Sequence, residues 1–382
     1  MYKILVIETA SVGSSKYRLQ DPNYKLLTTD EDFKIDFAPI NKPNVFFQDL
    51  YDMIIIHSST FNTPDLKSTI KTLQKAGTKF VLDIDDYWVY DKHHQLYSLM
   101  KSLQSKFMDI VMQVDAVTVS TEYLRLKVKP YNKNVYVLKN AVDLKHRQYK
   151  PYKVESEKVR IGWIGGSTHL KDLEMLRKMI FSLSKSSLNY QMILGGFTNK
   201  AKDKKGNISK LQKPEYWAKV EHIFTNEYRL KDKQYLLHLL EYNEGTYHNE
   251  IEQEYRRFWS RDISNYANMY DEIDISLAPL LVSEFNNAKS ELKLIEAGAK
   301  KCAVVASNLT PYNSVATHGV DAFLVNGNVN KNDWYKYVYM LAKDKSLRED
   351  MALKLHELVC NEYDLNKTVV LRKEVYLDIL GA

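Results

Sequence analysis

The chain has 382 residues, enough for two domains that each bury a core. Its hydrophobic content of 45%, charged content of 27% and formal net charge of +6 are typical of a soluble globular protein, which permits an acidic partner without requiring one. The two cysteines lack metal spacing and no apolar run is long enough to span a membrane, which argues against a disulfide scaffold, a zinc protein and a membrane-spanning protein. A cytoplasmic location is expected.

Short apolar runs alternate with helical patterns over residues 1–150, as in βαβ units around a parallel sheet. The expected strands are residues 3–7, 53–56, 80–84, 116–119 and 135–138, and the expected helices are residues 64–76, 94–112 and 122–129. Residues 140–159 are polar, rich in Lys and Tyr, and show no apolar periodicity, so the interdomain linker is expected there.

A second series of strands is expected at residues 159–164, 191–194, 273–278, 303–306 and 322–325. Residues 198–262 fit no simple βαβ spacing and are interpreted as an insertion, helical over 231–259. The tail from Lys331 is expected to be helical. These patterns predict a first doubly wound domain over residues 1–150, a second over 151–365, and a helix at 366–382 that packs back on the first domain. In such tandem domains ligands bind at the carboxyl ends of the strands, which face each other across a cleft.

The loop that follows the first strand is residues 9–22, TASVGSSKYRLQDP. Gly13 and Ser14 permit close backbone approach, while Lys16 and Arg18 supply positive charge for a phosphate or an acceptor. The loop lacks the GxGxxG spacing of a dinucleotide fingerprint, and a flexible surface loop is the competing interpretation.

Residues 83–88, DIDDYW, follow another expected strand. Asp85 and Asp86 are candidates for a catalytic acid or base, or for ligands of a divalent metal. The competing interpretation is that one carboxylate caps the next helix while the others orient neighbours. We expect a cleft role without a metal, with His57, after the strand 53–56, on the acceptor side of the same site.

Residues 165–171, GGSTHLK, lie between an expected strand and an expected helix. Gly165 and Gly166 before the helix cap Ser167 make a compact anion-binding loop, to which His169 or Lys171 adds charge. The similar Gly195–Gly196 pair after residues 191–194 is expected to be a turn.

Residues 285–307, FNNAKSELKLIEAGAKKCAVVAS, predict a loop, a helix and a buried strand. Lys289, Lys293 and Glu296 are spaced to share one helical face, where the two lysines repel each other and oppose the helix dipole. An anionic ligand at this helix start would turn both penalties into binding energy, and Glu296 could accept hydrogen bonds from a ribose diol. The alternative is a solvated Lys/Glu face. Pro311, farther on, mainly indicates a helix start.

The ordered series VRIGWIGGSTHLKDL, DISLAPL, FNNAKSELKLIEAGAKKCAVVAS and a following PY resembles retaining family-4 glycosyltransferases of the GT-B fold, most closely the phage-type members. The resemblance covers most of the chain except the insertion. It implies a nucleotide-diphosphate sugar as substrate, with a UDP-sugar favoured, no essential metal or other cofactor, and retention of anomeric configuration. By position, Glu296 would bind the ribose, Lys293 and the Gly165–Gly166 loop would face the diphosphate, and Lys289 and Ser290 would lie beside the phosphate and the transferred sugar. The donor site would also include Pro311 and Tyr312.

The sequence departs from that family at three places. Ala288 occupies the position of the first acid in the usual E-x7-E pair. Lys301 and Ala303 replace the usual Gly and Pro after the helix, so the turn must close differently. An Arg/Lys pair common after the first strand of the second domain is absent, which leaves His169 and Lys171 as candidates.

The acceptor is left open by the sequence. A hydroxymethylated pyrimidine in phage DNA is one candidate, because residues 125–153 interleave lysines with tyrosines. A cell-envelope glycan, a protein or a small molecule are the others. The competing functions are a nucleotide-sugar epimerase, a phosphorylase, or a degenerate module that binds nucleotide without catalysis.

Overall fold

The computed structural model describes residues 1–9, 13–39, 49–92, 94, 96–197, 200–202, 208–210, 215–225, 255–327 and 332–382. The chain forms two compact units. Unit 1 consists of Met1–Leu144, Ser283–Ile295 and Cys360–Ala382, and unit 2 consists of Lys145–Val282 and Glu296–Val359. Both units are therefore assembled from separate stretches of sequence, whereas the division expected at residue 150 was contiguous.

Unit 1 is built on a six-stranded parallel sheet with the order β2-β1-β3-β4-β5-β6. The strands are β1 (Tyr2–Glu8), β2 (Phe33–Pro39), β3 (Met53–His57), β4 (Lys79–Ile84), β5 (Ala116–Val119) and β6 (Val135–Val137). The strands expected in this half of the chain are confirmed. The edge strand β2 is additional, and its mixture of buried, half-buried and exposed residues explains why it gave no apolar run.

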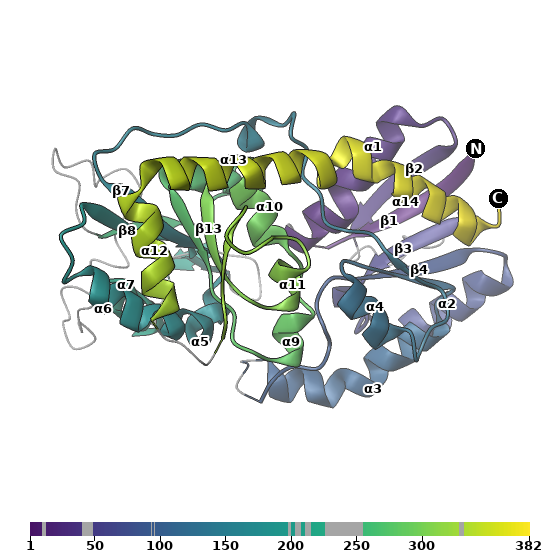
Figure 1. Ribbon diagram of the computed structural model, residues 1–382. Helices are drawn as coiled ribbons and strands as arrows, with labels where there is room; N and C mark the ends of the chain where they lie inside the picture. Colours follow the sequence, from purple (N-terminus) through teal and green to yellow (C-terminus); the bar gives the residue numbers. More distant parts are fainter. Residues whose placement is uncertain are drawn as a thin grey trace. The chain divides into compact units, whose positions relative to one another are not determined.

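Helices cover both faces of this sheet, because successive side chains of a strand point to opposite sides. Ile4 and Val6 of β1 pack with residues of one set of helices, while Leu5 and Ile7 pack with the other. The first set is α1 (Asp21–Thr29) and α14 (Leu365–Leu380), and the second is α2 (Leu66–Lys75), α3 (Tyr97–Gln113) and α4 (Glu122–Val128) (Figure 1). The arrangement is a doubly wound α/β unit.

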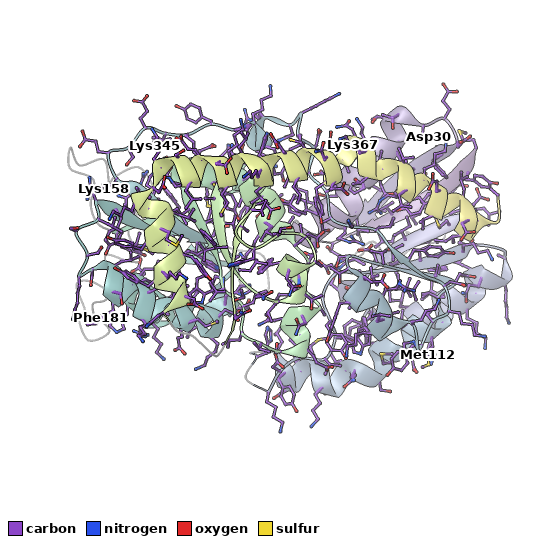
Figure 2. The ribbon with its side chains drawn as sticks, viewed as in Figure 1. Asp30, Met112, Lys158, Phe181, Lys345 and Lys367 are labelled. Carbon is purple, nitrogen blue, oxygen red and sulfur yellow. The ribbon has the colours of Figure 1, made fainter. Side chains whose placement is uncertain are left out.

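Helix α14 is fixed to α1 within unit 1. The hydroxyl of Tyr376 donates a hydrogen bond of 3.0 Å to Asn23 Oδ1 in the buried layer. Lys373 Nζ lies 2.7 Å from Asp30 Oδ2 at the end of α1, where Asp30 is labelled in Figure 2.

The segment expected to be a loop over residues 9–22 is largely helical. A π-helix, η1 (Ser15–Gln20), runs directly into α1, with Ser14 in helical conformation at its start. Pro22 is the second residue of α1, immediately after the change from π-helix to α-helix. The Gly-Ser-Ser sequence favours a turn, but here Gly13 and Ser14 are helical and lead directly into η1.

Unit 2 contains a second six-stranded parallel sheet with the order β11-β8-β7-β12-β13-β14. Its strands are β7 (Val159–Ile164), β8 (Tyr190–Phe197), β11 (Tyr255–Trp259), β12 (Ile275–Ala278), β13 (Ala303–Ser307) and β14 (Phe323–Val325), and β9 (Lys200–Lys202) and β10 (Ile208–Lys210) form a separate antiparallel pair. The five strands expected in this half of the chain are confirmed.

The expected helix over residues 231–259 is wrong at its end. Tyr255–Trp259 form the edge strand β11, paired in parallel with β8. Aromatic residues favour strands, and Arg257 satisfies its buried charge on Glu221, with Nε 2.6 Å from Oε1. Residues 226–254 of the insertion lie outside the described residues.

The helices of unit 2 are η4 (Arg147–Tyr149), η5 (Ser167–His169), α5 (Leu170–Leu173), η6 (Glu174–Leu176), α6 (Arg177–Leu183), α7 (Glu215–Thr225), η7 (Tyr266–Glu272), α11 (Thr310–Asn313), α12 (Asp333–Lys343) and most of α13 (Lys345–Glu362). Side chains of α6, α7 and α12 form one core with the strands. Helix α10 (Leu292–Ala299) approaches α13 closely at Gly298, where a Cβ would lie 2.7 Å from Val359 Cγ2 (Figure 1). Within the described residues, no helix has both the length and the apolar character needed to cross a bilayer.

Candidate functional site

Unit 1 contains a buried ion pair at the carboxyl end of β4. The guanidinium of Arg18 binds Asp83 through two hydrogen bonds, Nε to Oδ1 at 2.9 Å and Nη2 to Oδ2 at 2.8 Å, and both side chains are fully buried. Arg18 also donates to the carbonyl of Leu138, and Thr118 Oγ1 donates to Asp83 at 2.6 Å. Burial alone would lower the pKa of Arg18, but the Asp83 carboxylate raises it overall. Arg18, expected as an accessible charge for an acceptor, is instead a buried tether between η1 and β4.

His57 and Asp85 lie together at the ends of the neighbouring strands β3 and β4. Asp85 Oδ1 is 3.1 Å from His57 Nε2, and Ser59 Oγ is 2.8 Å from Nδ1. Burial would lower the pKa of His57, yet the hydrogen bond to Asp85 raises it overall. Burial would likewise raise the pKa of Asp85, and His57 lowers it overall. Both ring nitrogens of His57 are thus engaged, and the imidazole holds the Asp85 carboxylate in a fixed orientation.

Lys289 lies in the turn between α9 (Glu284–Asn287) and α10, and its Nζ is 3.6 Å from Asp86 Oδ1. The ammonium also sits over the Phe285 ring, 4.7 Å from its centroid. Because α10 begins at Leu292, the expected single face of Lys289, Lys293 and Glu296 does not form. Only Lys293 and Glu296 share the helix, and Lys289 has an acidic partner in place of the expected repulsion.

Three other predicted residues of unit 1 have simpler surroundings. Gly13 and Ser14 lie at the start of the helical segment, with no side-chain cap bond from Ser14. Lys16 pairs with Asp21 at 2.8 Å. Ala288, where the resembling family has an acid, is fully buried in the apolar core beside Phe285, so this position suits a methyl group and not a carboxylate.

In unit 2 the Gly165–Gly166 turn follows β7 and is supported by the end of β8. Gly165 N donates to Gly195 O at 3.0 Å. Gly196 has a φ of +94°, and a Cβ there would lie 2.7 Å from Gly165 O, so this position requires glycine. The expected turn at Gly195–Gly196 is therefore strand, and its function is to let the two backbones approach. A Cβ on Gly166 would meet nothing within 4 Å, so its backbone borders open space.

Asp172 joins the loops that follow β7 and β12. Its Oδ2 is 2.8 Å from His169 Nδ1, and its Oδ1 accepts a hydrogen bond of 2.8 Å from Leu281 N. Burial raises the pKa of Tyr312, with a smaller contribution from the Asp172 carboxylate, so α11 after β13 reaches the same neighbourhood. Sequence analysis missed Asp172 because an acid in the first turn of a helix suggests only a cap.

The remaining predicted residues of the Gly165 and α11 segments are Lys171, Ser167 and Pro311. Lys171 is exposed and its Nζ lies 3.3 Å from Glu174 Oε2. Ser167 begins η5, three residues of 3₁₀-helix that lead into α5. Pro311 stands in the first turn of α11, as its sequence position indicated.

Glu296 is buried in unit 2 under the aromatic residues of η7. Its Oε2 accepts a hydrogen bond of 3.2 Å from the Tyr270 hydroxyl, and only 4% of the residue is exposed. Burial raises the pKa of Tyr270 and of Tyr266, and the Glu296 carboxylate adds to both shifts. The two tyrosines, one helical turn apart after β11, lie between the expected insertion and the expected strand at 273–278, where the sequence predicted no element.

Two further features bear on the nature of the ligands. Among the described residues no cluster of His, Cys, Asp and Glu has the composition of a metal site. A hollow of about 1140 Å³ lies at the amino end of the unit 2 sheet, beside Val159 and Asp274. Its cations include Arg160, bound to Asp274 at 3.0 Å, and Lys345, 3.7 Å from Glu349, so we assign the hollow no part in the site.

No protein-family profile and no curated protein sequence matches this chain. Solved structures do match. They include sucrose-phosphate synthase from Thermosynechococcus elongatus (TM-score 0.68, 12% identity, 100% of both chains), HepE from Anabaena in complex with UDP and glucose (0.62, 14%, 99% of this chain and 100% of that one), and TarM from S. aureus in complex with fondaparinux, α-GlcNAc-glycerol and UDP (0.58, 13%, 86% and 55%). The chain thus spans about half the length of TarM. With its two parallel six-stranded sheets, the protein has the GT-B fold of these glycosyltransferases.

Proposed function

We propose that this protein is a glycosyltransferase that moves a sugar from a UDP-sugar to an acceptor hydroxyl with retention of anomeric configuration. The observation that carries the proposal is Glu296, a nearly buried carboxylate held by Tyr270 in a unit whose fold is that of glycosyltransferases solved with UDP. A carboxylate fixed in this way suits the two adjacent hydroxyls of a ribose, because it accepts two hydrogen bonds without reorganising.

The donor would be bound mainly by unit 2. In this proposal Gly166 and Ser167 present backbone N–H groups to the diphosphate, as the open space at Gly166 allows, while Gly165 holds the turn through its hydrogen bond to Gly195 O. Lys293 and Lys289 offset the charge that develops on the leaving diphosphate, which is stabilisation of the transition state. The other proposed donor residues are His169, Lys171, Ser290, Pro311 and Tyr312.

The acceptor hydroxyl would be positioned by unit 1. Asp85 and Ser59 engage both ring nitrogens of His57, so the imidazole would orient the Asp85 carboxylate, which would accept from the acceptor hydroxyl. Asp86 stands beside Asp85 in sequence, with Lys289 as its partner. Gly13, Ser14 and Lys16 complete the proposed acceptor side. The reaction needs no redox cofactor, since the bond from the anomeric carbon to the phosphate oxygen breaks and a bond to the acceptor oxygen forms.

The test of this function is release of UDP from a panel of UDP-sugars in the presence of candidate acceptors, followed by mass spectrometry of the products. Glu296→Ala should abolish turnover and His57→Asn should reduce it, while both variants unfold cooperatively. Equal turnover in the wild type and Glu296→Ala would refute the site. Consumption of donor with no acceptor product would indicate an epimerase.

The salt dependence of DNA binding tests whether DNA is the acceptor. A hydroxymethylated pyrimidine in phage DNA is one acceptor hypothesis, and a cell-envelope glycan, a protein or a small molecule are the others. The basic stretch argues less for DNA than its sequence suggested, because Arg125 pairs with Glu122 and Lys127 pairs with Glu284 at 2.6 Å. A protein that makes several phosphate contacts loses about 10³-fold in affinity for duplex DNA between 50 and 200 mM salt. A loss of that size would favour DNA as the acceptor. No binding at low salt would eliminate it.

A further inference from the structure

A hollow of about 360 Å³ lies within unit 1, between the carboxyl end of β6 and the helices α1 and α14, which run side by side (Figure 1). Pockets that hold small molecules typically have volumes of about 300–1,000 Å³, so this one suits a small ligand. Most of its wall is apolar and is formed by Pro22, Val137, Leu138, Ala141, Leu365 and Val369. Such a wall favours the hydrocarbon part of a ligand.

The wall of this hollow also contains a buried cation, Arg372. The residue is 3% exposed and belongs to the buried side of α14, between Val369 and Tyr376. Its Nη1 donates a hydrogen bond of 2.9 Å to the Tyr376 hydroxyl, which in turn donates to Asn23 Oδ1. Both partners are neutral, and among the described residues Arg372 has no carboxylate partner. A guanidinium stays protonated in proteins, so this buried charge lacks a counterion.

The guanidinium of Arg372 is accessible from the hollow. In the described part of the chain, the sealed side-chain nitrogens that lack a hydrogen-bond partner include none from Arg372. The nitrogens that Tyr376 does not engage therefore border accessible space, and the space that Arg372 lines is the hollow. A guanidinium binds a carboxylate through two parallel hydrogen bonds, so these free N–H groups have the geometry for an anion.

Two other charged residues determine how much negative charge the hollow can accept. Lys139 and Glu362 both line it, and both are exposed. Together with Arg372 they leave one positive charge in excess. A ligand with one negative charge balances that excess, whereas a second negative charge would be repelled by Glu362.

We propose that this hollow binds a small organic monoanion, with its carboxylate on Arg372 and its hydrocarbon body against the apolar wall. The site is additional to the proposed function, because its lining includes none of the proposed donor or acceptor residues. Its ligand would supply the counterion that Arg372 lacks. Binding to the native state would also stabilise the packing of α14 against β6 and α1 by mass action.

The experiment is calorimetric titration of the full chain with acetate, butanoate, hexanoate and the neutral analogue hexanamide. Affinity should rise by about fourfold for each added methylene, because each one buries apolar surface. Hexanamide should bind at least about tenfold more weakly than hexanoate, since it lacks the negative charge that pairs with Arg372. Tighter binding of hexyl phosphate than of hexanoate would overturn the assignment to a monoanion.

Variants of α14 test the assigned residues. Arg372→Met should weaken hexanoate binding at least about tenfold. Thr368→Phe should have the same effect, because Thr368 lines the hollow and the larger side chain fills it while the guanidinium remains. Lys373→Met is the matched control, since Lys373 follows Arg372 on the helix, pairs with Asp30 and does not line the hollow. This control should bind hexanoate as the wild type does.

The inference is overturned if the wild type binds no hexanoate, if affinity does not depend on chain length, or if Arg372→Met binds hexanoate as tightly as Lys373→Met. It is also overturned if ligand-free Arg372→Met melts well below the wild type, because Arg372 would then already have a structural counterion. Removing an unpaired buried charge should instead leave the melting temperature unchanged or raise it. UDP takes no part in these measurements, so their failure would leave the proposed function standing.

Discussion

The two units use the same kind of sheet but hold their carboxyl-end loops in different ways. In unit 1 the loops are joined by charged pairs: Arg18 with Asp83, His57 with Asp85, and Lys289 with Asp86. In unit 2 they are joined by close backbone approach at Gly165 and Gly196, and by single hydrogen bonds such as Leu281 N to Asp172 Oδ1.

In the proposed function this difference corresponds to different ligands for the two units. A loop edge in which charges already neutralise one another suits a neutral ligand, whereas a glycine turn with open space beside its backbone suits a phosphate. The carboxyl-end loops of unit 1 should therefore depend on paired charges and on pH, and those of unit 2 on backbone geometry. The following predictions test that contrast, from the largest effect to the smallest.

Arg18→Met should cost the most. It leaves Asp83 buried and unpaired, which typically destabilises by about 3–5 kcal/mol. The measurement is the free energy of unfolding in urea. Lys16→Met is the matched control, because Lys16 pairs with Asp21 nearer the surface and should cost no more than about 1 kcal/mol. Equal losses for the two variants would contradict a special role for the buried pair.

Gly196→Ala should destabilise unit 2 by about 2–3 kcal/mol, from strain at positive φ and a clash with Gly165 O. Gly166→Ala is the control for folding, since a Cβ there meets nothing. Thermal unfolding should separate the two, and UDP affinity should fall in Gly166→Ala if the diphosphate approaches that backbone. A normal melting temperature for Gly196→Ala would refute the close approach.

The pH dependence of the free energy of unfolding should report the titration of Glu291. Its pKa is near 4.5 unfolded and raised to about 7 folded, so the folded state holds the extra proton between these values. The free energy of unfolding should therefore fall by about 1–3 kcal/mol as pH rises from 4.5 to 7. Glu291→Gln should remove this part of the slope. An unchanged pH profile in that variant would mean that Glu291 titrates normally.

The His57–Asp85 pair should add two further pH ranges in which the free energy of unfolding changes. The raised pKa of His57 gives stability that is complete below 6.5 and is lost as pH rises through the folded pKa. The lowered pKa of Asp85 gives stability that is present above 3.8 and is lost as pH falls through its folded pKa. His57→Gln should flatten the profile above pH 6.5 without altering the fall between 4.5 and 6.5.

The smallest effect is expected at Lys301, whose φ of +53° places a side chain in the left-handed region after α10. Lys301→Gly should stabilise by about 0.5–1 kcal/mol, because glycine adopts this helix-ending conformation without strain. Differential scanning calorimetry would measure the rise. A loss of stability would mean that the Lys301 side chain contributes contacts that outweigh the strain.

The positions of most strands were predictable because buried parallel strands are continuous apolar runs, as 53–56 and 80–84 show. Strands β2 and β11 were not predicted, because polar or arginine-rich edge strands lack a continuous apolar run. The glycine pair at 165–166 was placed correctly after β7, since glycine and helix-cap chemistry is local.

Pairings between distant residues were not predictable. The residues around Arg18 in the sequence do not indicate that it pairs with Asp83 in the core. The residues around Glu296 likewise do not indicate its hydrogen bond with Tyr270. His57 and Asp85 were assigned to the same site only because both follow strands. The break between α9 and α10, which removes Lys289 from the helix, depends on the burial of Phe285 and Ala288 in unit 1.

The most direct test of the account is thermal unfolding of the wild type and Glu296→Ala with UDP, GDP, ADP and CMP, each far above its expected dissociation constant. Binding to the native state stabilises by about 2.7 kcal/mol at a hundredfold excess over that constant. The account predicts a rise in melting temperature with UDP that is lost in Glu296→Ala. The same rise in both proteins, or no rise with any nucleotide, would contradict it.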